Sequence, residues 1–367
     1  MIEPNLAADR HRNNLTAAVQ QLRARMSVQA VSLADRLARI HGTYVKSQRD
    51  KGLNAAVDRM LGNIAGTVDD DSDVDIGRVE KRRALFVIGE SGSGKTTAIQ
   101  RMLAKRPEFQ PYADDYGREV LPAISFEAPK PLTLKLLART GLEAAGYPIV
   151  GDRQENLMWN LFKTQIKERS ILFVHIDEMQ HVIKGTGPNE IQNISDVVKS
   201  LLQIKDWPVH AIFSGVPSLA KFLQHDERQL RNRCEVVTFD RISFPGSASD
   251  IRKIALHIIK SDAEMEADES LFRDDEFAHR LIHAANGAFG TAIQIVRAAV
   301  GYAIYGGREK VGLSDFASVY SGFTGCPVAK NVFLADRWTE IAPELALSSL
   351  IEQYDREEAA ARKGGRK

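Results

Sequence analysis

The sequence has little cysteine, no long hydrophobic run and no excess of either charge. Its two cysteines, Cys234 and Cys326, lie far apart and lack the spacing of metal ligands, which excludes a disulfide scaffold and is typical of a reducing compartment. No stretch approaches the roughly 18 apolar residues of a membrane span. The N-terminus MIEPNLAADRHRNN also lacks the apolar core of a signal peptide. We therefore expect a cytoplasmic protein.

The charges of the chain nearly cancel, because 49 basic and 48 acidic residues leave a net charge of +1. Such a chain has no overall attraction to nucleic acid or membrane, so a partner of either kind needs a local patch. The 367 residues, of which 44% are hydrophobic and 26% charged, are enough for two or three compact globular units.

The first 66 residues or so show helical periodicity. Apolar residues recur at helical spacing in two sets, over residues 33–44 and 53–64. The segment TVDDDSDVD that follows predicts a solvated linker, and it lacks the glycine and terminal glutamate of an EF-hand loop. We predict a helical N-terminal extension with an acidic linker over residues 1–78.

From about residue 79, short apolar runs alternate with helical patterns, which predicts an α/β domain with a parallel sheet over residues 79–240. The predicted strands are 84–89, 121–127, 171–177, 209–214 and 235–239. The predicted helices between them are 96–104, 132–145, 153–168 and 191–203. After residue 240 no strand pattern remains, and four amphipathic segments predict an all-helical domain over residues 241–324, followed by a C-terminal tail over residues 325–367.

The motif GESGSGKTT at residues 89–97 fits the phosphate-binding pattern G-x-x-x-x-G-K-[ST], with the apolar run ALFVIG before it and the helical segment TTAIQRML after it. The backbone N–H groups of such a loop wrap the phosphates of a nucleotide, the lysine reaches the β and γ oxygens, and the threonine hydroxyl helps to hold Mg²⁺. We expect ATP and Mg²⁺ as ligands. The expected nucleotide contacts are Gly89, Glu90, Ser91, Gly92, Ser93, Gly94, Lys95, Thr96 and Thr97, with Thr96 also on the metal.

A second motif, ILFVHIDEMQH, is an apolar strand that ends in Asp177 and Glu178. A carboxylate at such a strand end holds the Mg²⁺ shell, and a neighbouring carboxylate polarises the attacking water. We assign the first role to Asp177 and the second to Glu178, an order that favours hydrolysis over transfer to another acceptor. The flanking His175 and His181 are more typical of packed or solvated histidines than of metal ligands.

Three features further along the chain narrow the class. The strand VHAIFSG ends in Ser214, where AAA+ proteins carry a polar residue that senses the γ-phosphate. The segment DERQLRNRCEVVTF then places Arg228, Arg231 and Arg233 before the last predicted strand. In AAA+ proteins an arginine there contacts the nucleotide of a neighbouring subunit, and a solvated basic turn is the alternative. A helical domain follows, as in AAA+ proteins.

On the segments GESGSGKTT, HIDEMQHV, FSGVPSL and QLRNRC, the chain resembles TniB/TnsC-type transposition ATPases, in the initiator-like branch of AAA+ proteins, over roughly residues 30–325. All P-loop proteins share the first segment, whereas the order of the other three is more specific. The resemblance implies an α/β P-loop core with a five-stranded parallel sheet and an all-helical lid. It also implies ATP-bound homo-oligomers, rings or filaments, on DNA, which connect a TniQ-like target selector to a DDE transposase and disassemble when ATP is hydrolysed.

The resemblance assigns roles by motif. These are nucleotide and Mg²⁺ binding at Lys95 and Thr96, hydrolysis at Asp177 and Glu178, the sensor at Ser214, and the trans arginine at Arg231 or Arg233. One departure concerns the G-x-x-R pattern of initiator-like helical domains, because GAFGTAIQ has Gly290 at the arginine position and Arg297 lies two turns later.

An oligomer of this kind contacts the phosphate backbone of DNA through a few basic side chains per subunit. Lys130, after the second predicted strand, and Lys184, after the second motif, are the candidates, and an ordinary surface lysine is the alternative at each position. The sequence shows no interleaving of aromatic and basic residues, so we expect double-stranded DNA to be bound with little sequence specificity.

The C-terminal segment FLADRWTEIAPELALSSLIEQY carries Trp338, Ile341, Leu345 and Leu347 on an apolar face, which either binds a partner or folds back on the core. Two other functions stay open, namely a STAND-like nucleotide-dependent switch and a helicase loader or protein-remodelling motor. A STAND protein usually carries repeat arrays, and a remodelling motor needs an aromatic pore loop, which FEAPKPLT does not offer.

Overall fold

The computed structural model describes residues 4–67, 82–130, 133–149, 151–182, 198–220, 223 and 233–345. Within these ranges the chain forms two compact units. The first, here the α/β unit, takes Met1–Ala18 and Lys46–Asp240, and the second, here the helical unit, takes Val19–Val45 and Arg241–Lys367. The N-terminal helices are thus divided between the units.

Three helices precede the sheet: α1 (Pro4–Ala24), α2 (Val28–Gly42) and α3 (Gln48–Ala65). Helix α2 begins at Ser27, whose hydroxyl accepts from the backbone N–H of Ala30 at 3.2 Å. Helix α3 begins at Ser47, whose backbone N–H donates to the Asp50 carboxylate at 2.7 Å. The predicted periodicity of residues 53–64 is confirmed, because the apolar face of α3 is buried in the α/β unit.

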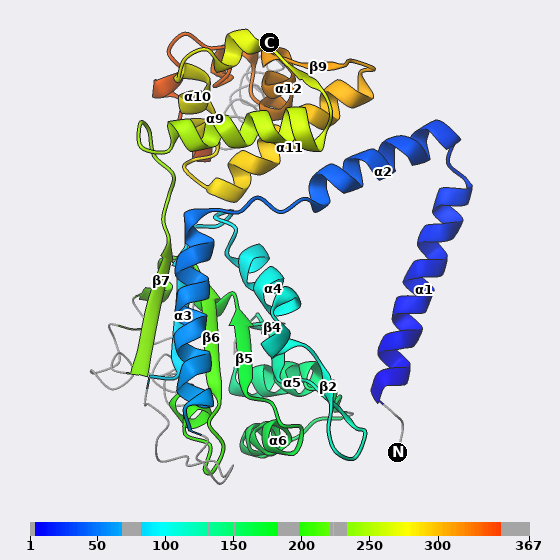
Figure 1. Cartoon of the computed structure of the whole chain (residues 1–367), viewed down its shortest axis with the longest axis vertical. Coiled ribbons are helices and arrows are strands. Elements are labelled where there is room, and N and C mark those ends of the chain that lie inside the picture. Colours follow the sequence, from blue (N-terminus) through cyan, green and yellow to red (C-terminus); the bar gives the residue numbers. More distant parts are fainter. Residues whose placement is uncertain are drawn as a thin grey trace, which may run out of the picture. The chain divides into compact units, whose positions relative to one another are not determined.

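The five-stranded parallel sheet predicted from the sequence is confirmed (Figure 1). Its order is β4-β5-β6-β1-β7. The strands are β1 (Ala84–Gly89), β4 (Ala123–Glu127), β5 (Phe173–Asp177), β6 (His210–Gly215) and β7 (Cys234–Phe239). Because all five run in one direction, their carboxyl ends meet at one edge of the sheet, where the predicted site residues follow the strands.

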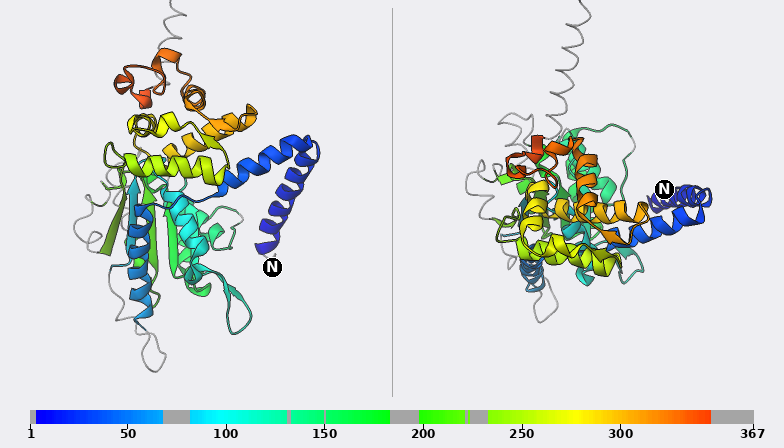
Figure 2. Two further views of the ribbon diagram at one scale, coloured as in Figure 1. Left: turned by 45° about the horizontal axis from the view of Figure 1, so that its top comes forward. Right: turned by 90° about the horizontal axis from the view of Figure 1, so that it is seen from above.

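Helices cover both faces of this sheet. One face, which includes Phe86, Val174 and Phe213, packs with α5 (Leu134–Ala144) and α6 (Glu155–Glu168) in one hydrophobic core. The other face packs with α3 and α4 (Lys95–Lys105) in a second core. Figure 1 and the left view of Figure 2 show α3 running alongside the strands. Two-sided coverage explains why β1 reads as the unbroken apolar run ALFVIG.

Short elements interrupt the alternation that the sequence predicted. A 3₁₀ turn, η2 (Pro107–Phe109), and an antiparallel hairpin of β2 (Tyr112–Ala113) and β3 (Glu119–Val120) lie between α4 and β4. A second turn, η3 (Met179–Val182), follows β5 and contains His181. Strands of two residues are too short to show an alternating pattern, so sequence reasoning missed the hairpin. Of the predicted helix 191–203, the structure describes residues 198–203, and residues 198–202 are helical.

The helical unit is built around α11 (Phe289–Tyr305). Its other long elements are α9 (Ala248–His257), continued by a π-turn η5 (Ile258–Asp262), α10 (Glu276–Ala284) and α12 (Leu313–Thr324). Helix α2 packs here, with Ile40 fully buried. The expectation that no strand follows residue 240 is wrong in one detail, because β8 (Glu266–Ala267) and β9 (Lys310–Val311) form a short parallel pair. The short turns are η6 (Glu269–Phe272), η7 (Val328–Lys330), η8 (Trp338–Glu340) and η9 (Pro343–Leu345).

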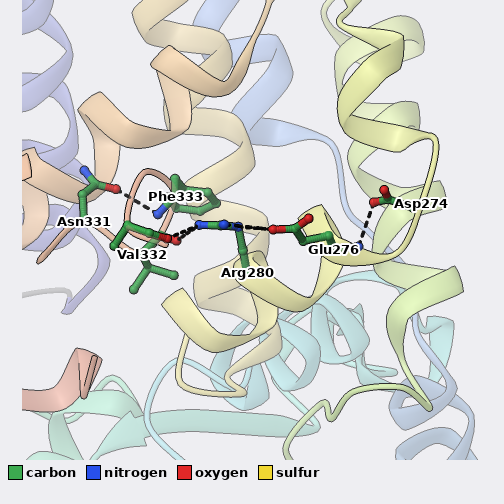
Figure 3. A network of polar contacts seen from close by, with 7 residues as sticks. Asp274, Glu276, Arg280, Asn331, Val332 and Phe333 are labelled. Carbon is green, nitrogen blue, oxygen red and sulfur yellow. Dashed lines mark hydrogen bonds and ion pairs between the residues drawn. The ribbon is translucent and has the colours of Figure 1, made fainter. Parts of the chain in front are cut away.

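The described part of the C-terminal segment folds back on α10 (Figure 3). The Arg280 guanidinium donates to the carbonyls of Val332 at 2.7 Å and Ala335 at 3.0 Å, and it lies over the ring of Trp338 at 5.2 Å. Trp338 is buried among the residues of the helical core. The apolar face predicted from the sequence therefore contacts its own unit at Trp338, while Leu345 is exposed and Leu347 lies outside the described residues.

Among the residues that the structure describes, no single helix combines the length and apolar character of a membrane span. Helices α10 and α11 pass that test only together, as a pair bent by 110°.

Candidate functional site

The glycines of the phosphate loop stand where the backbone needs them. A Cβ on Gly89 would lie 2.7 Å from both the Cβ and the carbonyl oxygen of Phe239, so only glycine fits beside β7. Gly92 and Gly94 have φ angles of 73° and 93°, in the left-handed region that side chains disfavour. Gly94 is the N-cap of α4, so the loop turns the chain from β1 into a helix whose N-terminus attracts anions.

The ammonium group of Lys95 lies inside this loop. Nζ donates to the carbonyls of Gly89 at 2.7 Å and Glu90 at 2.9 Å, and lies 3.4 Å from Ser93 Oγ. Burial lowers the pKa of Lys95, an effect that the carboxylates of Asp177, Glu178 and Glu90 oppose. A buried cation between nearby carboxylates and a helix N-terminus is suited to the phosphates of a nucleotide.

The expected contact residues of the loop differ in exposure. Ser93 and Lys95 are buried, Glu90, Gly94 and Thr96 are half-buried, and Ser91, Gly92 and Thr97 are exposed.

The carboxylate of Asp177 accepts hydrogen bonds from several of the polar groups at the C-terminal ends of the strands. Its Oδ2 accepts from the Thr96 hydroxyl at 2.6 Å, and its Oδ1 accepts from the Ser214 hydroxyl at 2.5 Å and from the backbone N–H of Glu178 at 2.9 Å. Burial raises the pKa of this carboxyl, but hydrogen bonds from Ser214, Thr96 and the Glu178 backbone outweigh it and hold the pKa below its usual value. A carboxylate and a threonine hydroxyl side by side are hard oxygen ligands that fit Mg²⁺.

His175 lies behind Asp177 and is fully buried. Its Nδ1 lies 2.8 Å from Ser125 Oγ, and its Nε2 lies 2.8 Å from Ser214 Oγ. Burial lowers the pKa of His175 to about 4, so the ring is neutral at pH 7. Both nitrogens have hydroxyl partners, so His175 is a packed, hydrogen-bonded histidine.

Glu178 adopts a strained backbone, with a φ of 57° that is uncommon for any residue except glycine. Its Oε2 accepts from the Gln180 side-chain amide at 2.5 Å. The Gln180 oxygen in turn accepts from the backbone N–H of Val216 at 3.1 Å. A Cβ on Gly215 would lie 2.5 Å from that oxygen, so the end of β6 and the Gln180 amide fit only with glycine there.

Arg233 lies at the N-terminal ends of the parallel strands, whereas the phosphate loop lies at their C-terminal ends. It directly precedes β7, where Cys234 pairs with Ala84 at the start of β1, whereas the loop follows the end of β1. Its guanidinium contacts the side-chain amide of Gln203, and its carbonyl accepts from the backbone N–H of Arg83 at 3.1 Å. Arg233 therefore belongs to a different surface from the residues around Asp177.

The remaining candidates are either outside the described residues or described elsewhere in the structure. Arg228, Arg231 and Lys184 lie outside the described residues, as does most of the acidic linker. Lys130 is described and exposed, beyond the end of β4. Gly290 lies in the first turn of α11, and the half-buried Arg297 donates to the carbonyl of Thr43 within the helical unit.

Sequence reasoning missed two residues of this site, Ser125 and Gln180. The only signal for Gln180 was its place in IDEMQH, two residues after Glu178. Ser125 had no linear signal, because it meets His175 only through the register of β4 and β5.

A separate pocket of about 310 Å³ lies in the helical unit. Its lining includes the stacked rings of Phe244 and His279, whose centroids are 3.9 Å apart, together with Arg241 and Asn286.

Residues 78–223 match the family model described as "AAA domain". This part of the chain is therefore similar to an AAA domain. No curated protein sequence matches the chain. Among solved structures, the chain is similar to the ORC2 protein of Aeropyrum pernix in ADPNP–ADP complexes, with 11% identity and a TM-score of 0.53, over 80% of this chain and 75% of that one.

Two further solved structures match the chain with lower TM-scores. Cdc6p of Pyrobaculum aerophilum is 12% identical, with a TM-score of 0.49, over 80% of this chain and 75% of its own. The RuvB branch-migration motor of Thermotoga maritima is 12% identical, with a TM-score of 0.40, over 77% and 72%. At these identities the similarity concerns the fold alone, which the chain shares with the ORC2 protein. The match to the AAA domain supports a nucleotide-binding ATPase in general terms.

Proposed function

We propose that the protein is an ATP-dependent transposition regulator of the TniB/TnsC type. It oligomerises on DNA in the cytoplasm, links a TniQ-like target selector to a DDE transposase, and disassembles when ATP is hydrolysed. The AAA domain supports the ATPase part of this proposal. The transposition part rests on the resemblance of HIDEMQHV, FSGVPSL and QLRNRC to that family.

The observation that carries the oligomeric part is the separation of Arg233 from the phosphate loop. The six residues of β1 span roughly 17 Å between the edge that holds Arg233 and the edge that holds Lys95. A guanidinium at that distance does not reach the γ-phosphate of its own subunit. A second copy of the chain would supply Arg233, or its neighbour Arg231, to the nucleotide bound here, where the arginine would stabilise charge in the transition state.

The remaining roles follow from the contacts around Asp177. Thr96 and Asp177 would hold Mg²⁺, which neutralises phosphate charge when it is bound. Lys95 would contact the β- and γ-phosphates, and Glu178 would accept a proton from the attacking water. Ser214, within hydrogen-bond distance of Asp177, would link the γ-phosphate side of the site to β6.

DNA binding would use exposed basic side chains along the assembly, with each contact modest and the sum salt-dependent. Lys130 supports this part of the proposal because it is exposed beyond the end of β4. Lys184 is the second candidate on sequence grounds.

Electron microscopy tests the proposal most directly. Full-length protein is mixed with duplex DNA and a non-hydrolysable ATP analogue, beside Lys95→Ala as a control that lacks the phosphate contact. We expect nucleotide-dependent rings or filaments on DNA, which the control does not form. Lys130→Glu should assemble with nucleotide but bind DNA more weakly, with a shallower salt dependence.

Two outcomes would overturn the proposal. A protein that binds ATP, stays monomeric and ignores DNA would be a nucleotide-dependent switch of the STAND type. A protein that forms oligomers without DNA, and whose ATPase responds to protein substrates, would be a remodelling motor.

A further inference from the structure

A chain of hydrogen bonds crosses three neighbouring strands behind the carboxylate of Asp177. It starts at Ser125 on β4, passes through His175 on β5 and Ser214 on β6, and ends at Asp177. Ser125 and His175 are register partners, and His175 and Asp177 lie two residues apart on the same face of β5. The heavy-atom distances along the chain are 2.8, 2.8 and 2.5 Å.

The number of available protons determines which group donates and which accepts in each hydrogen bond of this series. An ionised carboxylate only accepts, so the single proton of the Ser214 hydroxyl points to Asp177. The Ser214 oxygen then faces His175 as an acceptor, so Nε2 of His175 must carry a proton and donate it. In a neutral ring Nδ1 is then an acceptor, and the hydroxyl of Ser125 donates to it.

The inner members of this hydrogen-bond chain, His175 and Ser214, are buried polar groups in the interior of the sheet, which costs free energy. Phe173 and Ile212 on the same face are apolar and buried, and an apolar side chain at position 175 would pack there without a polar group. A buried polar group that loses its partner costs about 1–3 kcal/mol, so each link of the chain depends on the others. This arrangement favours a role for His175 beyond packing.

We propose that His175 and Ser125 are positioning residues for the metal-binding carboxylate. His175 Nε2–H holds the Ser214 hydroxyl so that its proton goes to Oδ1 of Asp177, which leaves Oδ2 for Thr96 and for Mg²⁺. Ser214 then acts first as a support for Asp177, and its proton is not free for the γ-phosphate while this contact persists. This inference rests on the proposed function, since it concerns the same nucleotide site.

Nuclear magnetic resonance tests the geometry without any activity. In full-length protein with ¹⁵N-labelled histidine, a long-range ¹H–¹⁵N correlation distinguishes the two ring nitrogens, and His175→Gln identifies the signals of His175. We expect Nε2 to be protonated and Nδ1 to be unprotonated in the wild type. Ser214→Ala should shift the Nε2 signal while the signals of His210 stay in place. A ring protonated at Nδ1 alone would overturn the inference.

A titration with Mg²⁺ tests the consequence. His175→Gln keeps a side-chain N–H donor, whereas His175→Leu removes it. We expect the half-saturating Mg²⁺ concentration for ATP hydrolysis to rise about tenfold in His175→Leu and Ser214→Ala, the size of effect seen when a partner of a metal ligand is lost, and to change little in His175→Gln. Ser125→Ala should give a smaller rise.

Two controls separate this role from a general loss of stability. His210→Gln replaces another buried histidine, at the start of β6, and should leave the Mg²⁺ dependence unchanged. Binding of a fluorescent ATP analogue in EDTA should be equal in wild type, His175→Gln and His175→Leu. An unchanged Mg²⁺ dependence in a folded His175→Leu protein would overturn the inference. A wild type without Mg²⁺-dependent hydrolysis would instead refute the proposed function, and the ring signals would still decide the proton positions.

Discussion

The side-chain amide of Gln180 donates to the carboxylate of Glu178 at 2.5 Å, while its oxygen accepts from the backbone of Val216 at 3.1 Å. One side chain thus joins the carboxylate that we expect to act on water to the strand end that carries Ser214. Both carboxylates of the site therefore have contacts that lead to β6.

Loss of the Gln180 contact should slow hydrolysis. We expect Gln180→Ala to lower kcat about tenfold with little change in KM, because Glu178 loses a contact that orients it and general-base catalysis depends on that geometry. Gly215→Ala should act in the same way, since its Cβ would lie 2.5 Å from the Gln180 oxygen. Steady-state ATPase kinetics of both variants check this, and a rise in kcat would show that the contact restrains Glu178 instead.

Gly89 should tolerate no side chain. Gly89→Ala places a Cβ 2.7 Å from the backbone oxygen of Phe239, so we expect a loss of stability of several kcal/mol and of nucleotide binding. Gly62→Ala is the matched control, because a Cβ added at position 62 in α3 would meet no neighbouring atom within 4 Å. Since alanine favours a helix more than glycine does, this variant should stabilise the protein by up to about 1 kcal/mol. Chemical denaturation and binding of a fluorescent ATP analogue measure both effects. Equal stability of the two variants would contradict the fit described for the loop.

Arg233 should act on the nucleotide of another subunit. We expect Arg233→Ala to bind ATP normally but to lose hydrolysis by at least a hundredfold. A mixture with Lys95→Ala should recover part of the activity, because the Lys95→Ala subunit supplies an arginine and the Arg233→Ala subunit supplies a bound nucleotide. The same complementation with Arg231→Ala decides which of the two arginines has this role. Activity that fails to recover with either partner would argue against a trans arginine in this segment.

The free energy of unfolding should decrease at acidic pH, because the ring of His210 is buried in its neutral form. Burial lowers the pKa of His210 to about 4, and the charge of Arg83 acts in the same direction, whereas its hydrogen bond to the carbonyl of Pro208 opposes the shift. Between pH 6.5 and 4 the unfolded chain binds a proton that the folded chain does not, so the free energy of unfolding falls as the pH falls.

The slope contributed by His210 approaches about 1.4 kcal/mol per pH unit in that window. We expect His210→Phe, next to the ring of Phe173, to have a shallower slope between pH 6.5 and 4.5. Urea denaturation at half-unit pH steps measures it. Parallel curves for the two proteins would show that His210 does not titrate on unfolding.

Arg280 should hold the C-terminal segment on α10. Arg280→Ala removes two hydrogen bonds to carbonyls and the ion pair with Glu276 (Figure 3). It also removes the contact with Trp338. We expect faster proteolysis within residues 325–345, with ATP binding unchanged. Arg337→Ala is the control, because its ion pair with Glu340 is exposed and contributes at most about 1 kcal/mol. Equal cleavage of both variants would contradict the anchoring role.

The central strands β1, β5 and β6 were predictable because each lies in a short, mostly apolar and fully buried run. The bounds of β1 were predicted to the residue, since ALFVIG is buried on both faces, and the parallel orientation of the strands followed from the intervening helices. The hairpin of β2 and β3 and the pair of β8 and β9 were not predictable, because two residues carry no periodicity.

The residues of the candidate site likewise fall into those that the sequence predicted and those that it did not. Lys95, Thr96 and Asp177 were found because their spacing along the chain is set by the phosphate loop and by the strand that ends beside it. Ser125 was missed because its partner is 50 residues away and is chosen by strand register. Gln180 was missed as a functional residue because its contacts depend on how η3 turns back toward β6.

The contacts of Arg280 also bear on which positions can change during evolution. Its two acceptors at Val332 and Ala335 are backbone carbonyls, which every amino acid supplies. This hydrogen bonding therefore constrains the identity of residue 280 and makes no demand on the side chains of Val332 and Ala335. Core packing, rather than hydrogen bonding, restricts the acceptor positions, because Val332 is buried in the helical core and Ala335 packs against it.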